Sequence, residues 1–343
     1  MKVAMYYNNH DLRIEEVPTP EIGSGELLVR IEASGICGSD LMEWYRIDKV
    51  PLVLGHEIAG KIVKVGEGVK GYKEGDRITA AHHVPCNTCH YCYSGHQTVC
   101  ETLRQTSFDP GGFAEYVRLV AINVDRGVHL LPDEVSYEEA TFTEPLACVL
   151  RGQRLARLAP GQTVMVIGSG ISGLLHIHLA STIGGAGRVV ATDIDSYRLE
   201  QARHFGADHT LRAEEYTPEI LRQLNDDRLA DLVVVCTTAK EAFLAALDSV
   251  ERGGTVLFFA PTDQDITFPL SINSLFWRNE VTLTSSYAGS PSEYALALKL
   301  LQSGKVRVRE MITHRLRLEE VGLGFRLVAK ATESLKVIIK PHH

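Results

Sequence analysis

The sequence Thr-Val-Met-Val-Ile-Gly-Ser-Gly-Ile-Ser-Gly, residues 163–173, decides the fold of this chain. It joins a short apolar run, typical of a buried strand, to the pattern G-x-G-x-x-G and then to an apolar helical segment. In this pattern Gly168 permits a tight turn, Gly170 lets the backbone approach a pyrophosphate, and Gly173 allows the helix to pack closely on the strand. Unpaired N–H groups at the start of the helix favour a bound phosphate. The residues expected to bind a dinucleotide are Gly168, Gly170, Ile171, Ser172 and Gly173.

An acidic residue follows the glycine pattern at a suitable distance. The next apolar run, 188–192, ends at Asp193, which lies 25 residues after Gly168. A carboxylate there can accept hydrogen bonds from the ribose hydroxyls of NAD and would repel the 2′-phosphate of NADP. Arg198, on the following predicted helix, could complicate this choice. Asp193 could instead cap that helix, although Asp195 or Ser196 could supply the cap equally well. Together the signals favour an NAD site that includes Asp193 and Arg198.

The second half of the chain continues the alternation of strands and helices. Six apolar runs predict strands, and the segments between them predict helices. This order is typical of a doubly wound parallel sheet in an α/β fold. The predicted strands are 163–167, 188–192, 209–211, 232–236, 255–260 and 281–285, and the predicted helices are 172–183, 196–205, 218–224 and 241–250.

The first half of the chain has a different pattern of apolar runs and glycines. Short β-like runs, at 26–33, 58–65 and 77–80, are separated by frequent glycines, as the turns of a compact β-rich domain require. A chain of this kind seldom ends on an isolated helix, so the last segment is expected to return to the first domain. The expected segments are 1–148 for the β-rich domain, 149–287 for the dinucleotide-binding domain and 288–343 for the returning segment.

Composition excludes several classes of protein. The 343 residues suggest about two domains. The 35 Lys and Arg residues against 43 Asp and Glu give a net charge of −8, which does not indicate nucleic-acid binding. No apolar run approaches the roughly 20 residues that span a membrane. The N-terminus reaches acidic residues before a signal-like apolar core can form. We therefore expect a soluble, cytoplasmic protein with neither a nucleic-acid nor a membrane partner.

Four of the seven cysteines lie close together, in the order C-x2-C-x2-C-x7-C. In a chain without an export signal this spacing favours metal binding over disulfides. Four thiolates complete a tetrahedral zinc site and leave no open position, which indicates a structural zinc in a lobe near residues 84–102. Iron is an alternative, because thiolates also suit it. The expected ligands are Cys86, Cys89, Cys92 and Cys100.

A second set of metal-ligating residue types is scattered. Cys37 stands in Gly-Ile-Cys-Gly-Ser-Asp, residues 35–40, and His56 and Glu57 follow Gly55. No local spacing connects the two segments, and each residue could equally be an ordinary core or surface residue. Spacing alone therefore leaves this second metal site open.

Taken together, the motifs resemble the zinc-dependent medium-chain dehydrogenases, the superfamily of alcohol, sorbitol and L-threonine dehydrogenases. The resemblance covers nearly the whole chain and implies a GroES-like catalytic domain, completed by the C-terminal segment, with a Rossmann domain inserted in it. It also implies a catalytic zinc, a structural zinc, NAD and a homo-oligomer, with a tetramer favoured. The motifs are CGSD at 37–40, GHE at 55–57, GDR at 75–77, the four-cysteine lobe, FAEY at 113–116, EPLA at 144–147 and GSGISG at 168–173.

The resemblance assigns roles to individual residues. Cys37 and His56 would be catalytic zinc ligands, with Glu57 as an adjustable ligand or close neighbour. Asp40 would orient His56, and Ser39 would pass on the proton of the alcohol. These assignments make Ser39, Asp40 and Glu57 the expected catalytic residues.

A fourth ligand comes from the EPLA motif. There Glu144 matches the carboxylate that the polyol branch uses where alcohol dehydrogenases place a cysteine, and Cys148 is a rival candidate.

The sequence departs from the family pattern at Met42, which stands where many relatives have the histidine that ends the proton relay. A thioether cannot transfer protons, so we expect water or Glu43 to complete the exit.

The resemblance implies hydride transfer from a secondary alcohol to NAD, giving a ketone. The carboxylate-type zinc site favours a polyol or a cyclitol. L-threonine 3-dehydrogenase is an alternative, for which Arg46 and Glu43 could bind the two charges of the amino acid. A general alcohol dehydrogenase and a non-catalytic dinucleotide-binding protein are further alternatives.

Overall fold

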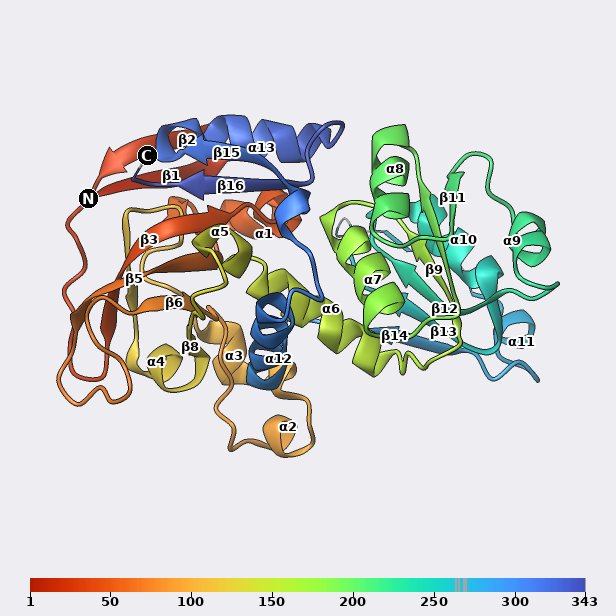
Figure 1. The fold of residues 1–343 in the computed structure, drawn as a ribbon, viewed down its shortest axis with the longest axis horizontal. Coiled ribbons are helices and arrows are strands. Elements are labelled where there is room, and N and C mark those ends of the chain that lie inside the picture. Colours follow the sequence, from red (N-terminus) through yellow and green to blue (C-terminus); the bar gives the residue numbers. More distant parts are fainter. Residues whose placement is uncertain (263, 265, 268–269, 343) are drawn as a thin grey trace. The chain divides into compact units, whose positions relative to one another are not determined.

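The computed structural model describes residues 1–262, 264, 266–267 and 270–342 (Figure 1). The chain divides into two compact units. Unit 1 comprises Met1–Ala147 together with Ala288–His343, and unit 2 comprises Cys148–Tyr287. One helix, α6 (Thr143–Leu155), begins in the first unit and ends in the second. The β-rich unit and the parallel sheet described below confirm the predicted fold class.

Unit 1 is built on two β-sheets whose strands are mostly antiparallel. A small sheet has the order β2-β1-β4, and a larger one has the order β15-β16-β3-β5-β6-β8, with β7 also paired to β3. The strands are β1 (Lys2–Asn8), β2 (Asp11–Glu16), β3 (Leu27–Gly35), β4 (Leu52–Val53), β5 (Glu57–Val65), β6 (Arg77–Ala80), β7 (Tyr116–Leu119), β8 (Val128–Leu130), β15 (Ile312–Arg317) and β16 (Lys336–Lys340).

The core of unit 1 lies around β3. This strand pairs with β5, β7 and β16, and apolar side chains from Leu27, Ile31 and Ile62 are fully buried on it and on its neighbour β5. Because β16 comes from the C-terminal segment, the last strand of the chain completes the sheet that begins near residue 27. The two ends of the sequence are thus joined by backbone hydrogen bonds.

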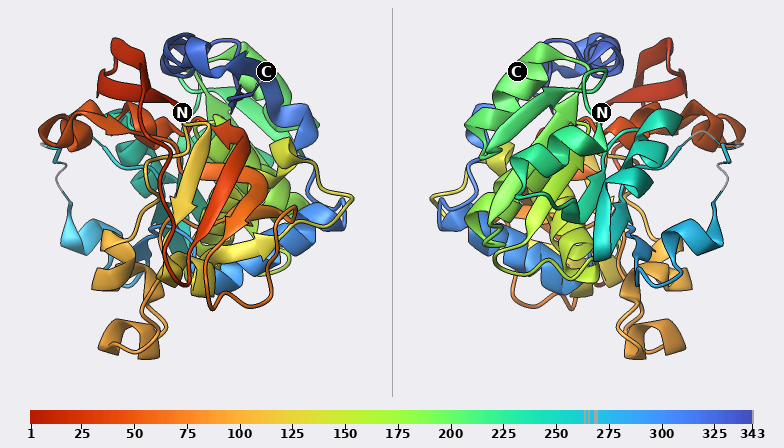
Figure 2. Two further views of the ribbon diagram at one scale, coloured as in Figure 1. Left: turned by 90° about the vertical axis from the view of Figure 1, so that its left-hand side faces the viewer. Right: turned by 90° about the vertical axis from the view of Figure 1, so that its right-hand side faces the viewer.

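Short helices connect the strands of unit 1. The four-cysteine segment forms a lobe that carries α2 and projects from the sheet (Figures 1 and 2). The helices before residue 147 are α1 (Glu43–Arg46), α2 (His90–Tyr93), α3 (Glu101–Gln105), α4 (Ala121–Gly127) and α5 (Tyr137–Ala140), and those of the C-terminal segment are α12 (Pro291–Gln302) and α13 (Val321–Lys330).

Unit 2 is a parallel sheet of six strands in the order β11-β10-β9-β12-β13-β14. The central strand β9 is buried along its whole length, as expected for a parallel sheet covered on both faces. Its strands are β9 (Thr163–Ile167), β10 (Arg188–Asp193), β11 (His209–Arg212), β12 (Ala230–Val235), β13 (Val250–Phe258) and β14 (Thr282–Ser285), and its helices are α7 (Ile171–Thr182), α8 (Ser196–His204), α9 (Pro218–Leu224), α10 (Lys240–Ser249) and α11 (Ile272–Leu275).

The predicted elements of unit 2 agree with these bounds within a few residues, apart from β13, whereas the part of α6 that lies in unit 2 and the helix α11 were not predicted. β13 begins at Val250 rather than at residue 255, because Val250 pairs with Ala230 before a register shift in the β12–β13 ladder. The helix α11 has no counterpart in the sequence prediction, since a single turn is too short to show helical periodicity.

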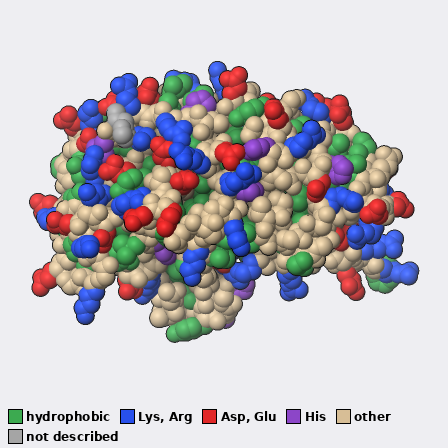
Figure 3. Space-filling model, in the orientation of Figure 1, with side chains coloured by type: hydrophobic (Ala, Val, Ile, Leu, Met, Phe, Trp, Pro, Cys, Tyr) green, Lys and Arg blue, Asp and Glu red, His purple; other side chains and the backbone are tan. Residues whose placement is uncertain are grey.

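No helix in the described part of the chain is long and apolar enough to cross a membrane. On the face shown in Figure 3, side chains of Lys and Arg are interspersed with those of Asp and Glu. This face therefore presents mixed charge rather than one continuous basic surface, in line with the net charge of −8.

Candidate functional site

The strand register of unit 1 brings the two scattered metal motifs together. β3 ends at Gly35 and β5 begins at Glu57, and these two residues are paired across the antiparallel ladder. The residues just after β3 and just before β5 therefore meet at one end of the sheet. One ligand atom each from Cys37, His56 and Glu57 lies within 4.8 Å of the other two.

Cys37 is held by the turn that follows it. It caps the short 3₁₀ turn Gly38–Leu41, where its Sγ accepts hydrogen bonds from Ser39 N at 3.4 Å and from Ser39 Oγ at 3.3 Å. The backbone N–H of Cys37 donates in turn to Asp40 Oδ2 at 3.0 Å. These hydrogen bonds fix the position of the Cys37 sulfur at the end of β3.

Asp40 also orients His56. Its side chain is fully buried, and its Oδ1 lies 3.3 Å from His56 Nδ1. Burial lowers the pKa of His56, but the Asp40 carboxylate and the Cys37 sulfur outweigh this effect and raise that pKa well above its usual value. With Nδ1 facing Asp40, Nε2 is the ring nitrogen left for a metal ion. A carboxylate behind a histidine ligand is the usual way to fix its ring direction.

Glu57 has a partner that the sequence analysis missed. Its buried carboxylate forms an ion pair with Lys336, the first residue of β16, whose Nζ also lies 3.4 Å from the carbonyl oxygen of Ile36. A Cβ at Gly35 would overlap Glu57 Oε2, so glycine at that position makes room for the carboxylate. The ion pair therefore fixes Glu57 beside Cys37.

Two further histidines lie beside this group. The ring centroid of His82 is 4.8 Å from that of His56 and 3.8 Å from that of His83. Burial lowers the pKa of both His82 and His83, to about 4 for His83. His83 Nδ1 donates to Thr106 O at 2.6 Å, whereas His82 Nδ1 is buried without a hydrogen-bond partner. Their position directly before the four-cysteine lobe is the sequence signal that could have found them.

The other residues expected at this site are placed differently. Glu144 is buried in the first turn of α6 and is not among the metal-ligating atoms grouped around Cys37 in the described residues. Its rival Cys148 is four residues further along the same helix and is also outside that group. The Glu43 carboxylate accepts a hydrogen bond from Asn9 N at 2.8 Å, so it is anchored to the β1–β2 turn.

The four cysteines of the lobe form a second metal centre. The Sγ atoms of Cys89 and Cys92 are 3.6 Å apart, as are those of Cys86 and Cys100, and all seven cysteines of the chain are free thiols. These separations are far longer than a disulfide bond of about 2.05 Å. They match the edge of about 3.8 Å that zinc–sulfur bonds of about 2.3 Å define in a tetrahedron.

The thiols of the lobe differ in their electrostatics, since burial raises the pKa of the Cys92 thiol to about 12. Hydrogen bonds from the side chain and backbone of Thr88 lower the pKa of the Cys86 thiol to about 5. Leu103 packs fully buried against the cysteines. Four sulfur donors complete the coordination of zinc, so this is a structural zinc site.

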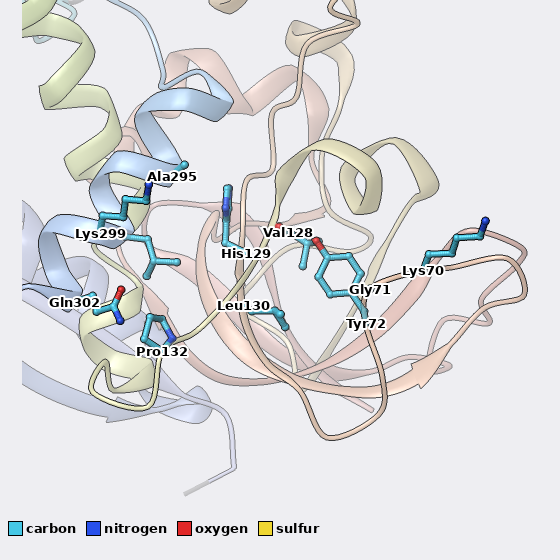
Figure 4. Close-up of a pocket in the computed structure, with 11 residues that line it drawn as sticks. Lys70, Gly71, Tyr72, Val128, His129, Leu130, Pro132, Ala295, Lys299 and Gln302 are labelled. Carbon is cyan, nitrogen blue, oxygen red and sulfur yellow. Dashed lines mark hydrogen bonds between the residues drawn. The ribbon is translucent and has the colours of Figure 1, made fainter.

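A separate groove of about 470 Å³ lies in unit 1 between α12 and β8 (Figure 4). His129 lies at its centre with its ring stacked on Tyr294, and Lys70 and Lys299 stand at opposite ends. The groove shares no residue with either metal-ligating group. The Cys37 group, rather than this groove, therefore defines the candidate active site.

The glycine loop of unit 2 is shaped to receive a dinucleotide. Gly168 has a φ of +92°, and a Cβ at Gly173 would overlap the Gly168 carbonyl oxygen, so both positions require glycine. A Cβ at Gly170 would meet only the Arg198 guanidinium, at 3.8 Å, which leaves open space over the loop. Ile171 and Ser172 begin α7, whose first N–H groups border this space.

Asp193 stands at the end of β10 beside the same loop. Its Oδ2 accepts a hydrogen bond from Ser169 N at 2.6 Å, and Arg198 Nη1 lies 3.9 Å from it. Asp195, and not Asp193, caps α8. The carboxylate of Asp193 is therefore positioned by the loop rather than used as a helix cap.

The comparisons with known proteins agree with this geometry. Residues 23–133 match the family model of the alcohol dehydrogenase GroES-like domain, and residues 172–303 match that of the zinc-binding dehydrogenases. Sorbitol dehydrogenase of Bacillus subtilis is 31% identical over 354 residues, which cover 100% of this chain and 98% of the relative.

Two solved structures are also similar over the whole chain. Alcohol dehydrogenase TADH of Thermus sp. ATN1 has a TM-score of 0.86 and 29% identity, with 99% of both chains covered. Galactitol-1-phosphate dehydrogenase of Escherichia coli has a TM-score of 0.87 and 29% identity, with 99% of this chain and 100% of that chain covered. The chain therefore belongs to the zinc-containing, medium-chain alcohol dehydrogenase superfamily, a class of NAD(P)-dependent oxidoreductases, as its motifs predicted.

Proposed function

We propose that the chain is a zinc-dependent dehydrogenase that oxidises a secondary alcohol, of the polyol or cyclitol type, to a ketone with NAD. The observation that carries this proposal is the grouping of Cys37, His56 and Glu57 within 4.8 Å of one another. A sulfur, an imidazole and a carboxylate are the donors of catalytic zinc sites, which keep a position open for substrate. The four-cysteine site has no such position.

The residues of the Cys37 group have different proposed roles. Cys37 and His56 would hold the metal ion, with Glu57 as an adjustable third ligand and Glu144 proposed as a further carboxylate ligand. A zinc ion held there supplies a Lewis acid that stabilises negative charge on the substrate oxygen. Asp40 keeps the His56 ring in the ligating orientation through the contact at Nδ1.

Ser39 is proposed to move the proton of the alcohol. Its Oγ lies 3.3 Å from Cys37 Sγ, so the hydroxyl sits next to the proposed ligand group and can accept a proton from a substrate hydroxyl bound there. From Ser39 the proton is proposed to pass to water or to Glu43, whose Oε2 accepts a hydrogen bond from Asn9 N, because the neighbouring Met42 has no group that transfers protons.

Removing this hydroxyl gives a testable result. Ser39→Ala is expected to lower kcat by about 10²-fold, because positioned acid–base groups contribute on this scale. Ser39→Thr retains a hydroxyl and is expected to restore most of the rate. The measurement is steady-state NADH formation for the three proteins at equal zinc content. Equal kcat values for Ser39→Ala and the parent would contradict the relay.

NAD is proposed as the cofactor because of Asp193. The carboxylate is held beside the glycine loop, where it can accept hydrogen bonds from the adenosine ribose and would repel a 2′-phosphate. A bound NAD supplies the nicotinamide ring to which the substrate carbon passes its hydride. Arg198, 3.9 Å from Asp193, is the residue positioned to moderate this preference.

The cofactor preference can be tested at one position. Asp193→Asn removes the negative charge but keeps an acceptor oxygen for Ser169 N. We expect the ratio of kcat/KM for NAD to that for NADP to fall by about tenfold, the effect of about 1.4 kcal/mol. As a matched control, Arg198→Gln in the parent protein removes the neighbouring positive charge. This variant is expected to raise the ratio. An unchanged ratio in Asp193→Asn would refute the assignment.

The polyol part of the proposal is supported by the relatives. Sorbitol dehydrogenase is a polyol enzyme by its name, and the identity of 31% over the whole chain supports a substrate of the same chemical class. We further propose a cytoplasmic location, since free thiols persist in a reducing compartment, and a homotetramer. Oxidation of sorbitol, inositol and 2,3-butanediol with NAD tests the substrate class, and light scattering tests the assembly.

A further inference from the structure

The N-terminal hairpin, β1 with β2, contacts both segments that supply the Cys37 group. Strand β1 pairs with β4 over Leu52–Val53, and β4 ends three residues before His56. The turn between β1 and β2 carries Asn9, which is hydrogen-bonded to the segment that follows Cys37. The hairpin therefore holds the chain on both sides of the loop that joins the two metal motifs.

Asn9 is the residue of the hairpin that makes the contact on the Cys37 side. Its backbone N–H donates to Glu43 Oε2 at 2.8 Å, and its side-chain Nδ2 donates to the carbonyl oxygen of Leu41, also at 2.8 Å. Its Oδ1 accepts from the hydroxyl of Tyr6 at 2.9 Å. Because Tyr6 is fully buried in β1, its hydroxyl fixes the direction of the Asn9 amide and keeps the NH₂ end toward Leu41.

The segment that Asn9 contacts is continuous with the proposed proton-transfer residue. Leu41 is the last residue of the 3₁₀ turn Gly38–Leu41, which carries Ser39 and is called the Ser39 turn below. A single turn fixes several backbone dihedral angles for very few hydrogen bonds of its own, so it is weak in isolation. Contacts from outside the turn, such as those of Asn9, therefore decide how well it is held.

From these contacts we propose that Asn9 is a positioning residue that holds Ser39 in place for proton transfer. It acts through Leu41 and Glu43 rather than by contact with a substrate, and the inference rests on the proposed dehydrogenase function. A group that takes a proton must lie within hydrogen-bond reach of it, and small displacements of such a group cost rate. A loose Ser39 turn would place the hydroxyl in reach less often.

Replacing Asn9 tests this role by kinetics. Asn9→Ala retains the backbone donor to Glu43 but loses the side-chain bonds to Leu41 and Tyr6. With the most rapidly oxidised of sorbitol, inositol and 2,3-butanediol, kcat is expected to fall about tenfold at equal zinc content. KM for NAD is expected to stay unchanged, because the glycine loop proposed to bind NAD lies in unit 2.

The neighbouring asparagine provides a matched control. Asn8 ends β1, and its Oδ1 accepts from His10 N rather than bonding to the Ser39 turn. Asn8→Ala therefore removes a side-chain hydrogen bond of the same hairpin and is expected to retain the parent kcat. An equal loss of kcat in Asn8→Ala and Asn9→Ala would overturn the inference, because it would show a general effect of the hairpin.

Hydrogen exchange measures the Ser39 turn without turnover. In zinc-replete protein without substrate, the amides of residues 38–46 are expected to exchange about tenfold faster in Asn9→Ala than in the parent or in Asn8→Ala. The amides of β9 in unit 2 are expected to keep the parent rate. Parent-like exchange over residues 38–46 in Asn9→Ala would overturn the inference, because the turn would then be held without Asn9.

A double variant shows whether Tyr6 and Asn9 act through one contact. Tyr6→Phe keeps the buried ring but removes the donor to Asn9 Oδ1, so the amide can turn its oxygen toward Leu41 and kcat is expected to fall. Tyr6→Phe combined with Asn9→Ala is expected to lose no more activity than Asn9→Ala alone. Independent losses that multiply in the double variant would overturn the inference, since they would indicate two separate structural effects.

The same measurements separate this inference from the proposed function. A parent that oxidises alcohol, together with an equal kcat in Asn9→Ala, would overturn the inference and leave the dehydrogenase intact. If no compound is oxidised by the zinc-replete parent, the dehydrogenase function is contradicted, and the role of Asn9 in proton transfer with it. Faster exchange confined to residues 38–46 of Asn9→Ala would then remain as a property of the hairpin alone.

Discussion

Replacing Cys37 with serine is expected to lower kcat/KM for alcohol oxidation by about 10³-fold, because a metal ion supplies several kcal/mol of charge stabilisation in such reactions. The sulfur is one of three grouped donors, and a serine hydroxyl in its place can still accept from Ser39 N and Oγ but is a poor zinc ligand. Zinc content is expected to fall from two ions to one per chain, since the four-cysteine site is untouched. Elemental analysis and NADH formation measure the two effects on one preparation.

The control uses a cysteine outside both groups. Cys236 follows β12 in unit 2, and burial raises the pKa of its thiol, so Cys236→Ser is expected to retain activity and both zinc ions. Glu144→Gln and Cys148→Ser compare the rival fourth ligands, and only the first is expected to reduce zinc content. Full activity of Cys37→Ser at one zinc per chain would show that the Cys37 group is not the active site.

Replacing Lys336 with methionine is expected to destabilise the chain by about 3–5 kcal/mol, the usual cost of breaking a buried ion pair. Both side chains of the pair are almost completely buried, so Glu57 would be left as an uncompensated charge in the core of unit 1. The methionine retains the length of the aliphatic stem, which limits the loss of packing. Urea unfolding of protein without an ion at the Cys37 group measures the change, because a zinc ion there would itself compensate the Glu57 carboxylate.

A double variant isolates the electrostatic part of this effect. Glu57→Gln combined with Lys336→Met removes both charges and is expected to recover most of the lost stability. If the double variant is as unstable as Lys336→Met alone, the loss comes from packing and not from the unpaired carboxylate. A stable Lys336→Met protein would contradict the ion pair itself.

The dinucleotide-binding unit could be predicted from local sequence because its signals are local. An apolar strand, the glycines from Gly168 to Gly173 and Asp193 after the next strand follow one another within one β–α–β unit. The four-cysteine site could also be predicted from local sequence, because its ligands lie within 15 residues. In both cases the spacing along the chain already determines which side chains meet.

The Cys37 group required information that no local pattern contains. Cys37 and His56 meet only because Gly35 pairs with Glu57 across the β3–β5 ladder, and a different register would separate them. The resemblance supplied that information, whereas spacing alone left the site open. Lys336 is 279 residues from Glu57 and reaches it only because β16 pairs with β3 in the same sheet.

Side-chain direction also limited the prediction. The sequence offered water or Glu43 as an outlet for protons, and the structure adds only that Glu43 Oε2 accepts a hydrogen bond from Asn9 N, so this choice stays a prediction. Asp193 and Asp195 were rival helix caps, and the structure assigns the cap to Asp195. Such choices depend on which of several equivalent polar groups a side chain meets, and composition does not determine this.

The central claim is that the Cys37 group oxidises an alcohol with the help of a metal ion. The most direct test is NADH formation by zinc-replete protein with sorbitol, inositol, L-threonine, 3-hydroxybutyrate and sorbitol 6-phosphate. The same preparation is then measured after a chelator has removed the zinc ion proposed at the Cys37 group, and again after zinc is restored. The account predicts turnover of one substrate class that is lost with that ion and returns with it. Turnover that persists without the ion, or none at all from zinc-replete protein, would contradict it.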